Sequence, residues 1–183
     1  MKDHGLIRKT RTRMGRNRKG INVQRHVGRL VHALEVERGP LWITIEQEYE
    51  SVGMSHYVVR LTVYAYEPRV DVAIRLHKDS VWEPENVYIP LPFSLPNAQL
   101  WLEKAGALMR PGIDQIPGTG LDFYCIQNGL GWIGQEQGLA IAMPDTPLVQ
   151  LGPLAFGDRL LQGQQDRNEV RAIYSWILNN FWE

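Results

Sequence analysis

The sequence contains a single cysteine, Cys125, and this scarcity excludes several classes of protein. An intrachain disulfide needs two thiols, and a cysteine-based zinc site needs several. The chain also contains no Asn-x-Ser/Thr acceptor for N-glycosylation. Because neither disulfides nor glycosylation sites are present, the sequence fits a reducing, cytoplasmic setting.

Long apolar runs are missing too. No run approaches the roughly eighteen residues that a membrane-spanning helix requires, so we expect no membrane association. The N-terminus is basic but is followed by no apolar segment, and it therefore lacks the pattern of a secretory signal. The 183 residues are 44% hydrophobic and 22% charged, which is typical of a globular domain with a core.

Charge is balanced over the whole chain but unevenly distributed. Residues 1–30 hold ten Lys or Arg and one acid, whereas residues 31–183 hold ten Lys or Arg and nineteen acids. Such an asymmetry can mark an arm that binds nucleic acid. No aromatic residues are interleaved with these cations to stack on bases, so nucleic acid is not the expected partner. We interpret residues 1–27 as a basic, poorly ordered segment.

Alternating apolar and polar residues predict antiparallel strands at 41–50, 56–66 and 69–77. Three glutamates share one face of the first strand, and adjacent acids on a strand are expected to face water. Residues 87–91 form a further strand whose prolines cannot donate ladder hydrogen bonds, which predicts a sheet edge. Short alternating strands with frequent turns indicate an all-β fold, and we expect an antiparallel β-sandwich over residues 28–183.

The second half of the chain continues this pattern. Residues 99–102 are predicted as a short strand or a turn of helix. Further strands are expected at 122–126, 131–134, 138–143 and 148–151. In residues 170–181 the apolar positions recur at helical spacing, so the pattern by itself predicts a helix there.

The most unusual residue choices gather between Met109 and Gly152. Two turns rich in Pro and Gly, at 110–112 and 115–120, should be rigid because Pro fixes φ and Gly allows positive φ. Fixed donors and acceptors suit recognition of a hydroxyl-rich ligand. The alternative is that the Arg and the Asp of this loop pair with each other and brace it. The candidate substrate-lining residues are Arg110, Asp114, Gln115, Asp122 and Tyr124.

Catalytic and metal-binding motifs are not recognisable. His77 and Asp79 form the one His-x-Asp pair, and an exposed pair at a strand end is the expected interpretation. Cys125 lies in an apolar strand, where a thiol is usually inert core. Exposed tryptophans could stack on sugar rings, although core packing is their commoner role. The candidates for such a platform are Trp82, Trp101 and Trp132.

Several motifs in this order resemble a known family. They are Arg-Pro-x-x-Asp-Gln-x-Pro-Gly from Arg110, Asp-Phe-Tyr from Asp122, Asp-Thr-Pro-Leu-Val-Gln-Leu-Gly from Asp145, and Leu-Asn-Asn-Phe-Trp from Leu178. Together with the Tyr-x-x-Glu-Pro corner at Tyr64, they resemble the C-terminal β-domain of glycoside hydrolase family 38, the α-mannosidases. The resemblance covers about residues 28–183.

This resemblance implies an incomplete sandwich of the galactose mutarotase type, with an extended segment at 170–181 that favours strand over helix. The family's zinc and its Asp nucleophile belong to an N-terminal catalytic domain that this sequence does not contain. We therefore expect no catalytic residue, metal ligand or cofactor in this chain, which alone should be inactive. It would act as a fragment that supports hydrolysis of α-mannosidic bonds, with a mannoside and the missing domain as partners. A stand-alone carbohydrate-binding module is the alternative, and a binder of nucleic acid or an acidic partner is a third hypothesis.

Overall fold

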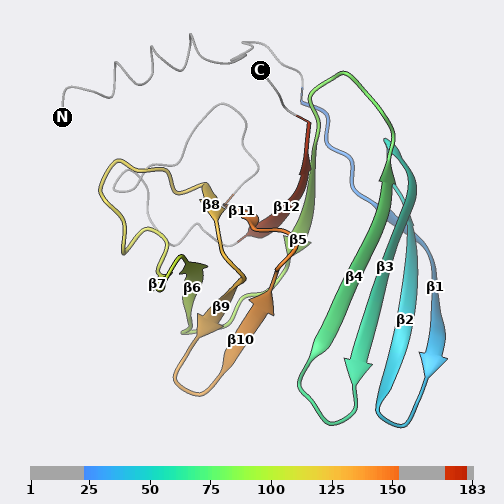
Figure 1. Cartoon of the computed structure of the whole chain (residues 1–183), viewed down its shortest axis with the longest axis horizontal. Helices are drawn as coiled ribbons and strands as arrows, with labels where there is room; N and C mark the ends of the chain where they lie inside the picture. Colours follow the sequence, from blue (N-terminus) through green and yellow to red (C-terminus); the bar gives the residue numbers. More distant parts are fainter. Residues whose placement is uncertain (1–22, 153–171, 181–183) are drawn as a thin grey trace. The chain divides into compact units, whose positions relative to one another are not determined.

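The computed structural model describes residues 23–152 and 172–180, and every regular element in them is a β-strand (Figure 1). Twelve strands form three four-stranded antiparallel sheets, and these ranges contain no helix. The prediction of an all-β antiparallel fold is confirmed. By internal contacts the chain divides into two compact units, with the division between Trp82 and Glu83.

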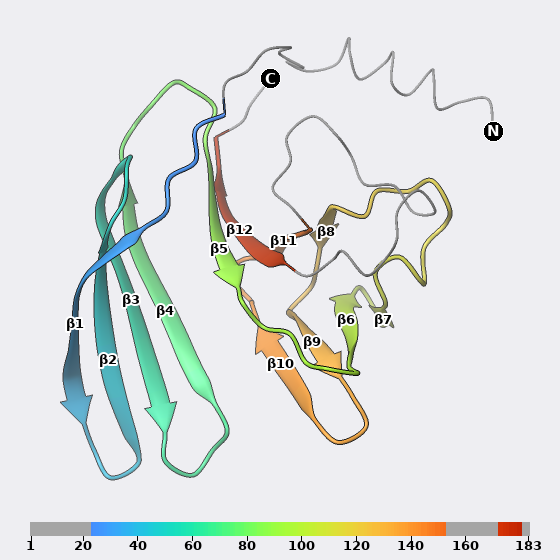
Figure 2. The same cartoon turned by 180° about the vertical axis from the view of Figure 1, so that it is seen from behind.

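The first unit is a single meander sheet, visible from behind in Figure 2. Each strand pairs with the next one along the chain. Three strands were predicted from alternation, and the first, which pairs with residues 42–50, was not. The strands are β1 (Arg29–Arg38), β2 (Trp42–Glu50), β3 (Met54–Tyr64) and β4 (Val70–Lys78).

The register of this sheet separates its side chains into two faces. Ile45 lies opposite Leu61, and Leu61 lies opposite Val72, so these three share an apolar face. Glu46 lies opposite Arg60 on the other face, and Arg60 donates a 2.7 Å hydrogen bond to it. Alternation with a period of two residues produces this separation. The predicted water-facing role of the β2 glutamates is confirmed, because Glu48 and Glu50 are exposed and Glu46 is half-buried.

The second unit contains two sheets. One has the order β10-β9-β6-β7 and the other the order β5-β12-β11-β8. The first consists of β6 (Gln99–Lys104), β7 (Ala107–Met109), β9 (Gly129–Ile133) and β10 (Gly138–Ala142). The second consists of β5 (Asn86–Leu91), β8 (Phe123–Cys125), β11 (Leu148–Leu151) and β12 (Ile173–Asn179).

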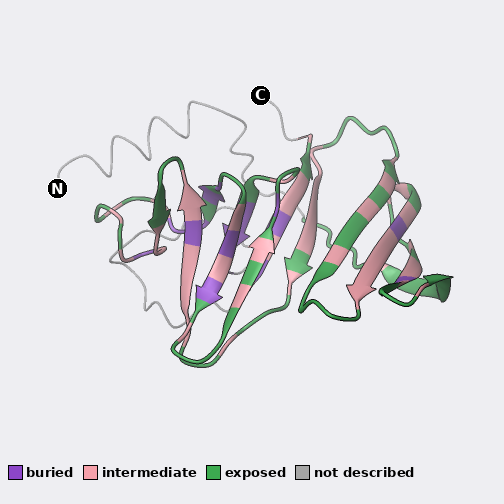
Figure 3. Ribbon diagram, turned by 60° about the horizontal axis from the view of Figure 1, so that its bottom comes forward, coloured by how far each residue is buried: buried purple, intermediate pink, exposed green. Residues whose placement is uncertain are grey.

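Both sheets of this unit contribute to one hydrophobic core, so the unit is sandwich-like. Leu102 of β6 and Leu151 of β11 have no exposed surface at all. Figure 3 shows the buried residues of this unit on strands of both sheets. The buried cluster comprises Leu102, Tyr124, Ile126, Leu130, Trp132, Met143, Val149, Leu151 and Ile173.

Two glycines let β10 approach β9 closely. A Cβ added at Gly129 would lie 2.5 Å from the carbonyl oxygen of Ile141, and one at Gly131 would lie 2.7 Å from that of Leu139. Real Cβ atoms essentially never come so near to backbone, so any larger residue would push the strands apart.

Two segments whose secondary structure the sequence left open are strands. Residues 99–104 are strand, and so are residues 173–179, where the apolar spacing alone had predicted a helix. The predicted edge at residues 87–91 is confirmed, since β5 ends its sheet. A further short strand, β7, was not predicted. Most of the basic segment 1–27 lies outside the described residues.

Two expectations about single residues are wrong. Cys125 is exposed, not core, because the buried side chains on either side of it point to the opposite face of β8. Trp132 is 7% exposed and belongs to the hydrophobic core, so it offers no surface to a ligand.

Candidate functional site

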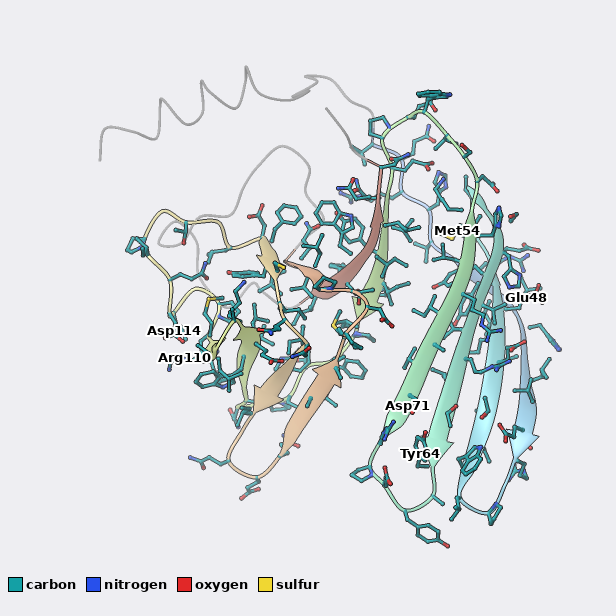
Figure 4. All side chains as sticks on the ribbon, in the orientation of Figure 1. Glu48, Met54, Tyr64, Asp71, Arg110 and Asp114 are labelled. Atoms are coloured by element: carbon teal, nitrogen blue, oxygen red, sulfur yellow. The ribbon has the colours of Figure 1, made fainter. Side chains whose placement is uncertain are left out.

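The loop between β7 and β8 opens with a charged pair, labelled in Figure 4. The guanidinium of Arg110 donates from Nε and Nη2 to the two carboxylate oxygens of Asp114, at 3.0 and 2.8 Å. The backbone N–H of Arg110 also donates to Asp114 Oδ2, at 2.8 Å. A bidentate pair of this kind fixes both side chains in direction, which single-point ion pairs do not.

The charged pair changes the acidity of its carboxylate. Hydrogen bonds from the Arg110 side chain and backbone lower the pKa of Asp114 from 3.8 to about 2. The same hydrogen bond raises the pKa of Arg110 above its ordinary value. Both groups therefore remain charged over the whole physiological range.

An aromatic ring supports the guanidinium. Arg110 lies over the ring of Trp101, with its Cζ 5.2 Å from the ring centroid. Trp101 belongs to β6, so this contact attaches the start of the loop to the sheet. The ring face that Arg110 covers is occupied, which weakens the prediction of Trp101 as a sugar platform.

A second polar pair braces the rest of the loop. Gln115 Oε1 accepts hydrogen bonds from the backbone N–H of Gly112 at 2.6 Å and from the hydroxyl of Tyr124 at 2.7 Å. Its Nε2 donates to the carbonyl of Gly120 at 3.1 Å. The side chain thus joins both predicted turns to the core, and positive φ angles at Gly112 (70°) and Gly118 (87°) confirm the predicted turn chemistry.

Tyr124 connects this network to the interior. The residue is 6% exposed and is part of the hydrophobic cluster. Burial raises the pKa of its hydroxyl to about 12, so the group stays protonated and can donate to Gln115.

Asp122 lies beside the same network. It is 7% exposed, and its backbone carbonyl accepts a 2.8 Å hydrogen bond from Leu151. Its Oδ1 comes so close to Gly120 that an added Cβ there would lie 3.2 Å away.

The structure therefore places four of the five predicted residues in two hydrogen-bonded pairs, and Asp122 lies close to Tyr124 in sequence without a side-chain bond to either pair. Arg110 pairs with Asp114, and Gln115 pairs with Tyr124, so the alternative of internal bracing is the arrangement found. Their role in lining a substrate pocket stays a prediction. The contribution of Trp101 was missed, because its contact with Arg110 depends on how β6 and the loop come together.

Two hollows that are open to solvent adjoin the hairpin of β6 and β7. One, of about 330 Å³, is lined by Lys104, Ala105, Cys125, Ile126 and Gln127. The other, of about 430 Å³, is lined by Glu103, Lys104, Gly106, Ala107 and Leu108. Neither contains any of the five predicted residues.

The described residues form neither a metal site nor a membrane-spanning helix. In the part of the chain that the structure describes, no three His, Cys, Asp or Glu side chains converge to hold a metal ion. His77 lies opposite His56 across β3 and β4. Within residues 23–152 and 172–180, no helix is long and apolar enough to cross a membrane.

No family model, no curated protein and no solved structure matches this chain.

Proposed function

We propose that this chain is the C-terminal β-domain of an α-mannosidase-like enzyme of glycoside hydrolase family 38, with no catalysis of its own. The order of the family-like motifs supports the proposal, and the all-β antiparallel architecture is compatible with it. In this proposal the sheets belong to a larger sandwich of the galactose mutarotase type. The protein acts in the cytoplasm, where its exposed thiol at Cys125 would stay reduced.

The observation that carries the proposal is the order of the family-like motifs, and the loop from Arg110 to Tyr124 is where the proposal expects contact with sugar. A guanidinium has five N–H donors. Asp114 takes two of those of Arg110. The other three are bonded by no acceptor among the described residues, so they are free to donate to sugar hydroxyls. Because the pair, the ring of Trp101 and the Gln115–Tyr124 contact hold the loop, such donors would be pre-organised for binding.

In this proposal the zinc and the nucleophile belong to another domain. The described residues do not fit a zinc site, because no suitable set of ligands converges. We assign no step of hydrolysis to this chain. Both functions would belong to the separate catalytic domain, which is the proposed partner.

The nucleotide sequence that flanks this reading frame gives the first test. We expect an adjoining frame that encodes a domain with a His-x-Asp zinc motif. The joined protein, supplied with zinc, should then hydrolyse nitrophenyl α-mannoside, whereas this chain alone should not. Flanks that encode only unrelated proteins would count against the proposal.

A matched pair of variants then tests the loop. In the joined enzyme, Arg110→Ala should lower kcat/KM at least about tenfold, because a charged hydrogen bond to substrate is lost. Arg75→Ala, which removes an exposed arginine from β4, should leave kcat/KM unchanged. Equal effects of the two substitutions would show that the loop has no role in the sugar pocket.

A stand-alone carbohydrate-binding module is the second candidate. It is favoured by Trp82, which is 85% exposed and so offers its ring to a sugar face. Titration of the isolated chain with methyl α-mannoside, followed by tryptophan fluorescence, tests this function. Binding that Trp82→Ala abolishes would favour the module over the enzyme domain, and absence of binding would reject it.

A further inference from the structure

The sheet of β1–β4 has an apolar face that no strand of its own unit covers. This face is defined by side chains from three neighbouring strands in continuous register. It consists of Ile43, Ile45, Val59, Leu61, Val63, Val70, Val72, Ile74 and Leu76.

The exposed fractions of the side chains show that no hydrophobic core is packed against this face. Only Thr44 and Val58 are buried in this sheet, and both lie on the opposite, polar face. Val70 is 52% exposed and Val72 is 58% exposed. Figure 3 shows the same sheet mostly in the colours of exposed and intermediate residues. A sheet with one apolar face needs a second layer against it, because water is otherwise in contact with that face.

We propose that this face packs against the same face of a second copy of the chain. Two identical sheets have the same twist, so they can pack face to face at the usual small angle between strand directions. The contact would be isologous, since each face would meet itself about a two-fold axis.

The charge distribution favours a second copy. In a two-fold contact only residues near the axis meet their own copies, so a face that is uncharged in its middle can meet itself without placing like charges together. From Ile43 to Gln47 in β2, and from Val70 to Leu76 in β4, the residues of this face are uncharged. Charges occur at its margins: Lys78 lies at the end of β4, and in β1 Arg38 donates a 2.8 Å hydrogen bond to Glu35.

Two polar side chains at one end of the face are already paired with each other. The hydroxyl of Tyr49 donates to Gln47 Oε1 at 3.1 Å, and the ring of Tyr49 stacks on that of Tyr57 with centroids 5.0 Å apart. If a second copy covered these groups, the hydrogen bond between Tyr49 and Gln47 would remain. Burying the two side chains would therefore cost little free energy.

The size of the face is adequate for a dimer. Its strands have 9 to 11 residues. With strands about 4.8 Å apart and a rise of about 3.3 Å per residue, the three strands of the face present a footprint of roughly 450 Å². Because side chains protrude from the backbone, the accessible area of the face is larger than this footprint. It approaches the area of about 800 Å² that each partner buries in a specific interface.

The mass of the full chain in solution, measured by light scattering over a wide range of concentrations, tests the proposal. We expect a species of twice the 21.0 kDa chain mass that dissociates on dilution. Val72→Glu should weaken association at least about tenfold, because it places a charge in the contact. Ala73→Glu, its exposed neighbour on the polar face, is the matched control and should leave association unchanged.

Circular dichroism of each variant separates loss of association from loss of folding. If Val72→Glu does not fold, Val70→Glu at the margin of the face replaces it. A chain that is monomeric at every concentration would overturn the proposal. A monomer that Val72→Glu destabilises would show instead that the face is covered within one chain, and equal effects of both glutamates would exclude this face as the contact.

Discussion

The two compact units have similar amounts of strand but are stabilised differently. The unit from Glu83 onward has short strands in two sheets, which enclose a cluster of nine buried hydrophobic residues. The unit up to Trp82 has strands of 9 to 11 residues in one sheet and only two buried residues. Its polar face is held by cross-strand pairs such as Arg60 with Glu46. The comparison shows that regular pairing can define a sheet without providing it with a core.

Removing a core side chain should give the largest effect. Leu102→Ala should lower the free energy of unfolding by about 2–5 kcal/mol, because Leu102 is fully buried and a cavity would remain. Leu61→Ala in the single sheet should cost about half as much, since Leu61 is only partly buried. Urea denaturation of both variants measures the two losses. Equal losses would mean that the two units are packed equally well.

A glycine substitution tests the close approach of β9 and β10. Gly131→Ala should destabilise by about 1–3 kcal/mol, because its Cβ would lie 2.7 Å from the carbonyl oxygen of Leu139. Gly39→Ala in the first unit is the control, since its Cβ would meet nothing closer than 3.7 Å. Thermal unfolding of both proteins gives the difference, and a neutral Gly131→Ala would contradict the close packing described here.

Acid should weaken the braced loop in a definite pH window. The folded-state pKa of Asp114 is about 2, below its ordinary 3.8. A carboxylate with a lowered pKa stabilises the fold above its unfolded value, and that stabilisation is lost as pH falls through the folded value. Stability should thus decline between about pH 4 and pH 2, and by less in Asp114→Asn. Urea midpoints measured across this range check the prediction, and parallel curves for the two proteins would contradict it.

The smallest effect is expected from the surface of the single sheet. Glu46→Gln should change the free energy of unfolding by at most about 1 kcal/mol, because its ion pair with Arg60 is partly exposed. The same urea measurement applies. A larger loss would mean that charge pairs, and not only strand pairing, stabilise this unit.

Most of the fold followed from alternation, and the failures have local causes. β1 was missed because register shifts between Leu30 and His32, and between Glu35 and Glu37, interrupt its two-residue period. The segment at 173–179 contains a register shift as well, between Trp176 and Leu178, and its apolar spacing imitates a helix. In both places an extra residue in a strand changes the pattern that sequence reasoning depends on.

The candidate loop was predictable in composition but not in its contacts. Its turns and its charged residues are visible in the sequence, and pairing of Arg110 with Asp114 was one of two alternatives. The support that Trp101 gives to Arg110, and the contact of Gln115 with Tyr124, depend on tertiary packing. Exposure of Cys125 also depended on which face of β8 became core.

The two register shifts in β1 also affect how the chain behaves at high concentration. β1 is an outer strand of ten residues, all of them exposed, with four large apolar side chains at 41–47% exposure. A straight outer strand of that length would be a template on which further chains could add and grow into fibrils. Bulges twist such a strand and break the regular spacing of its outward-pointing amides. The irregularity that concealed β1 in the sequence therefore protects the protein from aggregation along this edge.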